Sequence, residues 1–188
     1  MKIGAISLVV VILVATEIRA EDYFKPLDKM ALTPTELKWI YNYAPLVIEW
    51  VEEVEVRQLA EGRELTDSEF VLARSMSVNN PENIRVIVTS DFPVPLNRDL
   101  SDALRIYDFD PLDSAGMALG YAVFIKPEYE GDTALLAHEF VHVAQAESVG
   151  LRPFLVTYLA GLKMYGYFES PLETEARTEV WRLLNGSD

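Results

Sequence analysis

Residues 132–145 read Asp-Thr-Ala-Leu-Leu-Ala-His-Glu-Phe-Val-His-Val-Ala-Gln, and this segment is the most informative part of the sequence. Its length and its spacing of apolar residues predict a largely buried helix that starts near Asp132. Residues four apart lie one above the other on the same helix face, so the imidazoles of His138 and His142 converge. Inside an apolar helix, two bare imidazoles carry a desolvation cost unless something binds them. The segment therefore predicts a metal site on this helix.

The residue types in this motif suit zinc chemistry. Neutral imidazole is a common Zn²⁺ ligand, and Glu139 leans towards the open coordination position, where it can take a proton from a water that the ion activates. His138 and His142 are the only two histidines in the chain, so its entire imidazole content lies in the motif. The alternative is an amphipathic helix, in a purely structural domain, whose two histidines happen to lie four residues apart.

A catalytic zinc usually has three protein ligands and one open position. The chain has no cysteine, and the motif uses both of its histidines, so a carboxylate must supply the third ligand. A second helix is predicted to begin at Ser170-Pro171, and Glu173 and Glu175 follow directly. At about 100° per residue the two glutamates lie roughly 200° apart around that helix. Only one of them can be the ligand, and the spacing alone leaves both open.

The histidine motif at residues 138–142, followed by Glu173-x-x-Ala176, resembles the gluzincin branch of the zincin metallopeptidases. More closely, HEFVHVAQ together with PLETEA is similar to small exported zincin-like domains that carry an HELxHVxQ helix and a P-(L/F)-E-x-E-A helix. The resemblance covers about residues 115–182. It implies that His138, His142 and Glu173 bind zinc and that Glu139 is the catalytic base.

One departure from the gluzincin pattern concerns the third ligand. The wider pattern has an acidic residue after Ala176, whereas this chain has Arg177. A shifted register that starts at Glu175 would place Glu179 as the trailing acid. Glu173 is the favoured third ligand, and Glu175 is kept as the alternative.

Residues 1–20 have the layout of a signal peptide. Lys2 is followed by an apolar run from Ile3 to Ala15, which is shorter than the roughly 20 residues of a membrane-spanning helix. We expect cleavage after Ala20 and export to the periplasm or the medium, with no stable membrane span left in the mature chain. An uncleaved anchor is the alternative.

The composition limits the remaining possibilities. The chain has 188 residues, 50% of them hydrophobic and 24% charged, and we expect residues 21–188 to form one domain. The formal charge of −14 argues against a nucleic-acid partner, because such proteins neutralise phosphates with basic surfaces. The absence of cysteine excludes disulfides, thiolate metal sites and a thiol nucleophile. The sequence does not indicate an oligomeric state.

Patterns elsewhere predict a small α+β domain with a short, few-stranded sheet. Capping boxes at Thr33 and Thr66 predict helices over residues 34–62 and 67–76. β-branched residues predict a strand at 84–89, and an apolar run predicts a second, edge-like strand at 119–125. The apolar stretch 151–168 is interpreted as a core-packed helix rather than a membrane-binding one.

These observations together predict an exported, zinc-dependent peptidase that acts on a peptide or protein substrate. Peptidases of this type often use a tyrosine to stabilise the developing oxyanion, and Tyr165 and Tyr167, just before the third-ligand helix, are the candidates. The alternative function is a non-catalytic binding module in which the same zinc ligands stabilise the fold.

Overall fold

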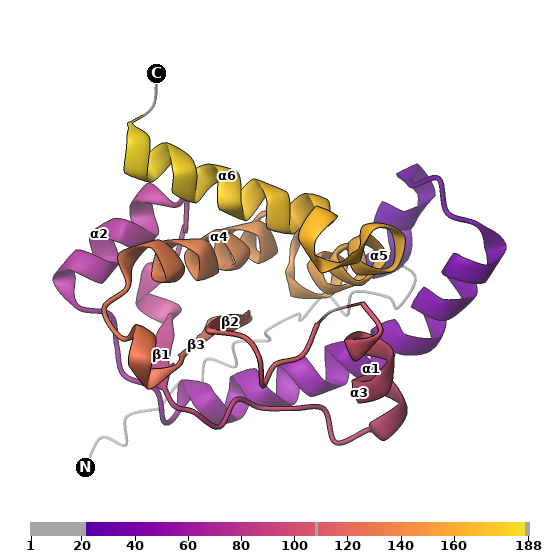
Figure 1. Cartoon of the computed structure of the whole chain (residues 1–188), viewed down its shortest axis with the longest axis horizontal. Coiled ribbons are helices and arrows are strands. Elements are labelled where there is room, and N and C mark those ends of the chain that lie inside the picture. Colours follow the sequence, from indigo (N-terminus) through magenta and orange to yellow (C-terminus); the bar gives the residue numbers. More distant parts are fainter. Residues whose placement is uncertain (1–21, 108, 187–188) are drawn as a thin grey trace, which may run out of the picture.

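A three-stranded mixed sheet surrounded by helices makes up the fold (Figure 1). A computed structural model of the protein describes residues 22–107 and 109–186, so the predicted signal peptide lies outside the described residues. The arrangement is α+β, which confirms the predicted fold class. In chain order, the elements are α1 (Pro34–Leu59), α2 (Asp67–Ser75), β1 (Arg85–Val88), α3 (Arg98–Arg105), β2 (Gly116–Leu119), β3 (Ala122–Ile125), α4 (Thr133–Val149), α5 (Leu151–Glu169) and α6 (Pro171–Asn185), with 3-10 helices at Asp22–Lys29, Pro81–Asn83 and Pro127–Tyr129.

Helices α1 and α2 begin at the capping boxes that the sequence predicts. The Thr33 hydroxyl accepts a hydrogen bond from the backbone of Glu36, and the Glu36 carboxylate accepts one from the Thr33 backbone at 2.7 Å. Thr66 and Glu69 form the same reciprocal pair at the start of α2. Each pair satisfies backbone donors that a helix start leaves open. Helix α1 ends at Leu59, slightly earlier than predicted.

The prediction of a single strand over Leu119–Ile125 is wrong. The chain turns at Gly120 and Tyr121, so this segment is the end of β2, a two-residue turn and then β3. Gly120 has φ +61°, a conformation that glycine adopts without strain. Strand β3 pairs antiparallel with β2 and parallel with β1, so it is the central strand rather than an edge. The edge strand beside the histidine helix is β2.

The central position of β3 explains why an alternating pattern is missing there. Ala122 and Phe124 pack into a core cluster shared with α1 and α5. Val123 and Ile125 pack into a second cluster with α2, α4 and α6. The sheet thus lies between α1 on one side and α4 on the other (Figure 1). A strand buried on both faces reads as a continuous apolar run.

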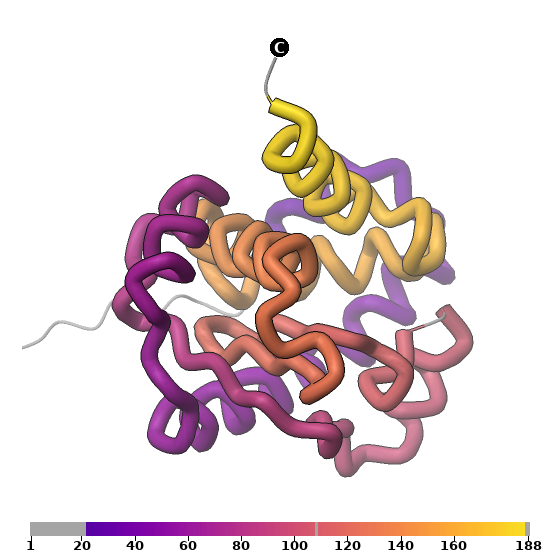
Figure 2. Tube along the Cα trace, turned by 60° about the vertical axis from the view of Figure 1, so that its left-hand side comes forward, coloured from indigo at the N-terminus to yellow at the C-terminus, as the bar shows by residue number. Residues whose placement is uncertain are grey.

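Helices α5 and α6 complete the frame of the site. Helix α5 is packed in the core, where its buried residues include Phe154, Val156 and Leu159. Helix α6 lies along α4, as Figure 2 shows from a second direction. Among residues 22–107 and 109–186, we find no helix with the length and hydrophobicity needed to cross a membrane. Together, α4, α5 and α6 bring the predicted site residues to one place.

Candidate metal centre

Helix α4 presents both histidines to one point. Its N-terminus is fixed by Asp132, whose Oδ1 accepts hydrogen bonds from the backbone of Ala134 and Leu135 at 2.9 and 3.0 Å. One turn separates His138 from His142, and their Nε2 atoms lie 3.2 Å apart. Two ring nitrogens at this distance share a single binding point, as the i, i+4 spacing predicts.

Helix α6 brings a carboxylate to the same point. Pro171 occupies the first turn, where its missing N–H has no cost, and Glu173 follows in that turn. Glu173 Oε2 lies 3.3 Å from Nε2 of His138, and Oε1 lies 3.1 Å from Nε2 of His142. A tetrahedral ion with bonds of about 2.0–2.1 Å needs ligand atoms roughly 3.3–3.4 Å apart. Among the described residues, these three form a cluster able to hold a metal ion.

The burial and the ionisation of the Glu173 carboxylate are those expected of a metal ligand. The residue is only 1% exposed, and its Oε2 has no hydrogen-bond partner among the described residues although it faces the imidazoles. Burial opposes its ionisation, but the interactions with His138 and His142 outweigh burial and hold the pKa of Glu173 well below its usual value. A buried, ionised carboxylate is costly unless cationic groups or a metal ion lie close to it, and the point between the two imidazoles that Oε2 faces is where a metal ion would lie.

Glu175, the alternative third ligand, lies outside this cluster. It is exposed, and its Oε2 accepts a hydrogen bond from Nε2 of Gln145 at 2.8 Å. The geometry therefore favours Glu173 over Glu175. Arg177, which departs from the gluzincin pattern, has its NH1 3.6 Å from Oε2 of Glu173. It also donates to the carbonyl oxygen of Phe168 near the end of α5, so it links α6 to α5.

Two further side chains, Tyr158 and Gln145, hold the candidate ligands in place, and only Tyr158 has no signal in the sequence. The Tyr158 hydroxyl on α5 donates to Oε1 of Glu173 at 2.7 Å. Burial, with the Glu173 charge second, raises the pKa of Tyr158 well above its usual value, so the hydroxyl stays a donor. Gln145 Oε1 lies 2.8 Å from Nδ1 of His142. Its position three residues after His142 signals local bonding, whereas nothing in the apolar sequence of α5 distinguishes Tyr158.

Glu139 lies beside the cluster and against the edge strand β2. It is 4% exposed, and burial raises its pKa above the usual carboxyl value. A Cβ atom added to Gly116 on β2 would lie 2.7 Å from Oε1 of Glu139. The missing side chain of Gly116 therefore makes room for the carboxylate. A carboxylate with a raised pKa is a better proton acceptor, which suits a general base.

The two candidate tyrosines differ in position. Tyr165 is 49% exposed and lines neither cavity at the site, whereas Tyr167 lines both. The last turn of α5 is broken at Gly166, whose φ of +72° favours glycine. Burial and then the nearby carboxylates of Glu173 and Glu139 raise the pKa of Tyr167, so its hydroxyl remains protonated.

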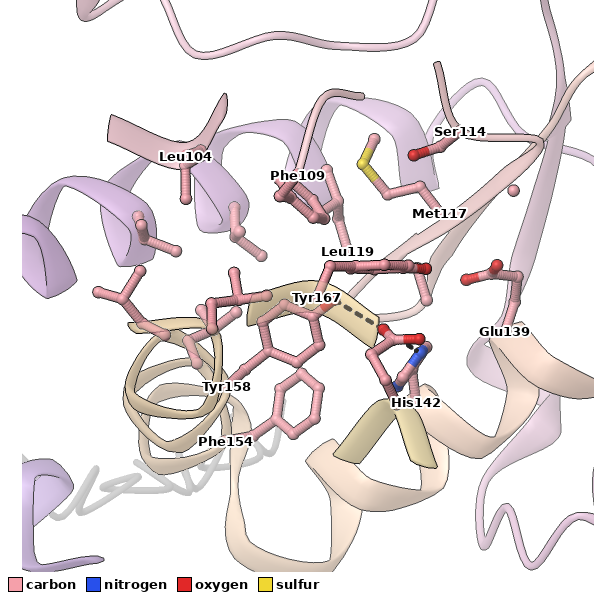
Figure 3. A pocket seen from close by; sticks show the side chains of 18 of the residues that line it. Leu104, Phe109, Ser114, Met117, Leu119, Glu139, His142, Phe154, Tyr158 and Tyr167 are labelled. Atoms are coloured by element: carbon pink, nitrogen blue, oxygen red, sulfur yellow. Dashed lines mark hydrogen bonds and ion pairs between the residues drawn. The ribbon is translucent and has the colours of Figure 1, made fainter. Parts of the chain in front are cut away.

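Two adjoining cavities give access to the cluster. An open cleft of about 570 Å³ reaches His138, Glu139 and Glu173 between α4, α6 and the segment before β2. A smaller, mainly apolar pocket of about 70 Å³ continues from the same residues between α1 and α5. Figure 3 shows Glu139, His142, Tyr158 and Tyr167 around this inner pocket. The candidate metal centre thus lies where the cleft meets the pocket.

Comparison of the chain with protein-family models, with curated proteins and with solved structures gave no match. A functional assignment therefore depends on the residues and on their geometry. Within the described residues, that geometry brings together His138, His142 and Glu173, with Glu139 and Tyr167 beside them, and leaves Tyr165 and Glu175 apart.

Proposed function

We propose that the protein is an exported zinc-dependent peptidase of the zincin type. The observation that carries the proposal is the cluster of His138, His142 and Glu173, with a second buried carboxylate, Glu139, at the end of an open cleft. The donor set of two imidazoles and one carboxylate is one that catalytic zinc commonly has. When bound, zinc polarises a substrate carbonyl and lowers the pKa of water.

Glu139 serves as the general base in this proposal. Its raised pKa lets it accept a proton from the attacking water and then pass that proton to the leaving amine. Tyr167 lines the cleft with a protonated hydroxyl, which can donate to the oxyanion that forms on the attacked carbonyl. In this proposal Glu139 transfers the proton and Tyr167 stabilises the negative charge.

The edge strand β2 provides a surface for the substrate backbone. Its inner edge pairs with β3, and among the described strands its outer edge has no partner. Gly116, the first residue of β2, and Ala115 just before it line the cleft. An extended peptide can add to such an edge through main-chain hydrogen bonds, which bind without strong dependence on side chains. Export is supported by the signal-peptide pattern of residues 1–20.

A non-catalytic zinc-stabilised module is the second candidate, and one observation favours it. Glu173 on α6 contacts His142 on α4 and Tyr158 on α5, so an ion held there would tie three helices together. In that case Glu139 lies beside the metal ligands without a catalytic role. Metal binding would then be required for folding rather than for turnover.

The experiment that separates the two candidates is the Glu139→Gln variant. The peptidase proposal predicts that the native protein cleaves members of a broad peptide library, while Glu139→Gln keeps one zinc and the native melting temperature but loses turnover. A general base contributes about 10²- to 10⁴-fold to rate. A native protein that binds zinc and cleaves none of the peptides would instead favour the binding module.

A further inference from the structure

Gln145 joins the two helices that carry the candidate ligands. On α4, its Oε1 lies 2.8 Å from Nδ1 of His142. Towards α6, its Nε2 donates to the carbonyl oxygen of Leu172 at 3.1 Å and to Oε2 of Glu175 at 2.8 Å. Leu172 immediately precedes Glu173, so one amide group contacts a candidate ligand on α4 and the backbone beside a candidate ligand on α6.

The partners of the amide nitrogen fix the orientation of the whole group. A carbonyl and a carboxylate only accept hydrogen bonds, so the nitrogen of Gln145 must face Leu172 and Glu175, and its oxygen must face His142. That oxygen can only accept. Nδ1 of His142 must therefore carry a proton, so in the neutral imidazole the lone pair is on Nε2, at the centre of the cluster.

We infer that Gln145 is a positioning residue for the metal centre. It holds His142 in the Nδ1–H tautomer that binds a metal through Nε2, and it holds the first turn of α6 where Glu173 reaches the same point. Partners behind a metal ligand orient it in this way and are worth about 10- to 100-fold in metal affinity. The inference rests on the metal-binding part of the proposed function and does not depend on peptidase activity.

Zinc affinity at a fixed pH, measured by competition with a chelating dye, tests the inference. Gln145→Met keeps the size of the side chain and removes all three hydrogen bonds, so we expect affinity to fall about 10- to 100-fold. Gln145 is half-buried, and the melting temperature checks that the variant is folded. Glu175→Gln is the matched control, because it still offers an acceptor to Gln145. Its affinity should stay close to native.

A double variant distinguishes positioning from simple packing. Gln145→Glu keeps an acceptor for His142 but places a carboxylate against Glu175, so on its own it should bind zinc weakly. Adding Glu175→Gln supplies a donor to the new carboxylate, and the double variant should regain affinity relative to Gln145→Met.

Proton NMR gives an independent test. In zinc-loaded native protein, it should show a slowly exchanging Nδ1–H of His142 that Gln145→Met loses. The chain has only two histidines, which makes this signal easy to assign.

Each outcome decides the inference. Unchanged zinc affinity and an unchanged Nδ1–H signal in Gln145→Met would overturn it while leaving the proposed function intact. Equal losses in Gln145→Met and Glu175→Gln would also overturn it, because Glu175 would then act as a ligand. A native protein that binds no zinc overturns both proposals, whereas a native protein that binds zinc without cleaving peptides refutes only the peptidase.

Discussion

Gly116→Ala tests how the edge strand positions the proposed base. The added Cβ would lie 2.7 Å from Oε1 of Glu139, whereas ordinary contacts begin near 3.4 Å, so the carboxylate must move by about 0.7 Å. A displacement of about 1 Å at a reacting group costs on the order of 100-fold in rate. We therefore expect kcat to fall by about 10- to 100-fold. The zinc content should not change, because the cluster does not include Glu139.

The assay is steady-state hydrolysis of a peptide that the native protein cleaves, with zinc content and melting temperature measured on the same samples. Gly62→Ala is the matched control. Its Cβ would lie 2.6 Å from Cβ of Arg85, a comparable clash outside both cavities of the site. The control should lose stability, by about 1–3 kcal/mol, but keep kcat. A kcat for Gly116→Ala within twofold of native would show that the missing side chain of Gly116 does not set the position of Glu139.

Three further predictions concern the oxyanion donor, acid stability and the metal. Tyr167→Phe should lower kcat by about 10²- to 10³-fold without loss of zinc, and Tyr165→Phe should leave kcat unchanged. The hydrogen bond from Arg63 lowers the pKa of Glu69 to about 2, so this pair stabilises the fold above pH 4.5 and the stabilisation disappears as the pH falls through about 2. In denaturant titrations, Glu69→Gln should cost about 1–2 kcal/mol at pH 7 and almost nothing near pH 2. In a thermal melt, chelation should lower Tm by about 5–10 °C, because ligand at 100 times Kd contributes about 2.7 kcal/mol.

The sequence predicted the elements whose signals are local. The capping pairs Thr33 with Glu36 and Thr66 with Glu69 mark helix starts because the hydrogen bonds join residues three apart. His138 and His142 are four residues apart on one helix, so helix geometry alone brings their imidazoles together. These features require no knowledge of the tertiary structure.

The features that the sequence did not predict are those that depend on tertiary packing. The run from Leu119 to Ile125 is almost entirely apolar because β3 is buried on both faces, and this concealed the turn at Gly120. The role of Tyr158 depends on α5 crossing next to α6, which no local pattern encodes. The choice between Glu173 and Glu175 depends on how α6 is rotated against α4.

The first measurement to make is the zinc content of residues 21–188, purified without a histidine tag and without added metal. We expect about one zinc per chain, lost in His138→Ala and in Glu173→Ala but kept in Glu175→Ala. A stably folded protein that takes up no added zinc would contradict this expectation, and would leave a helix whose two histidines lie four residues apart with no metal to bind.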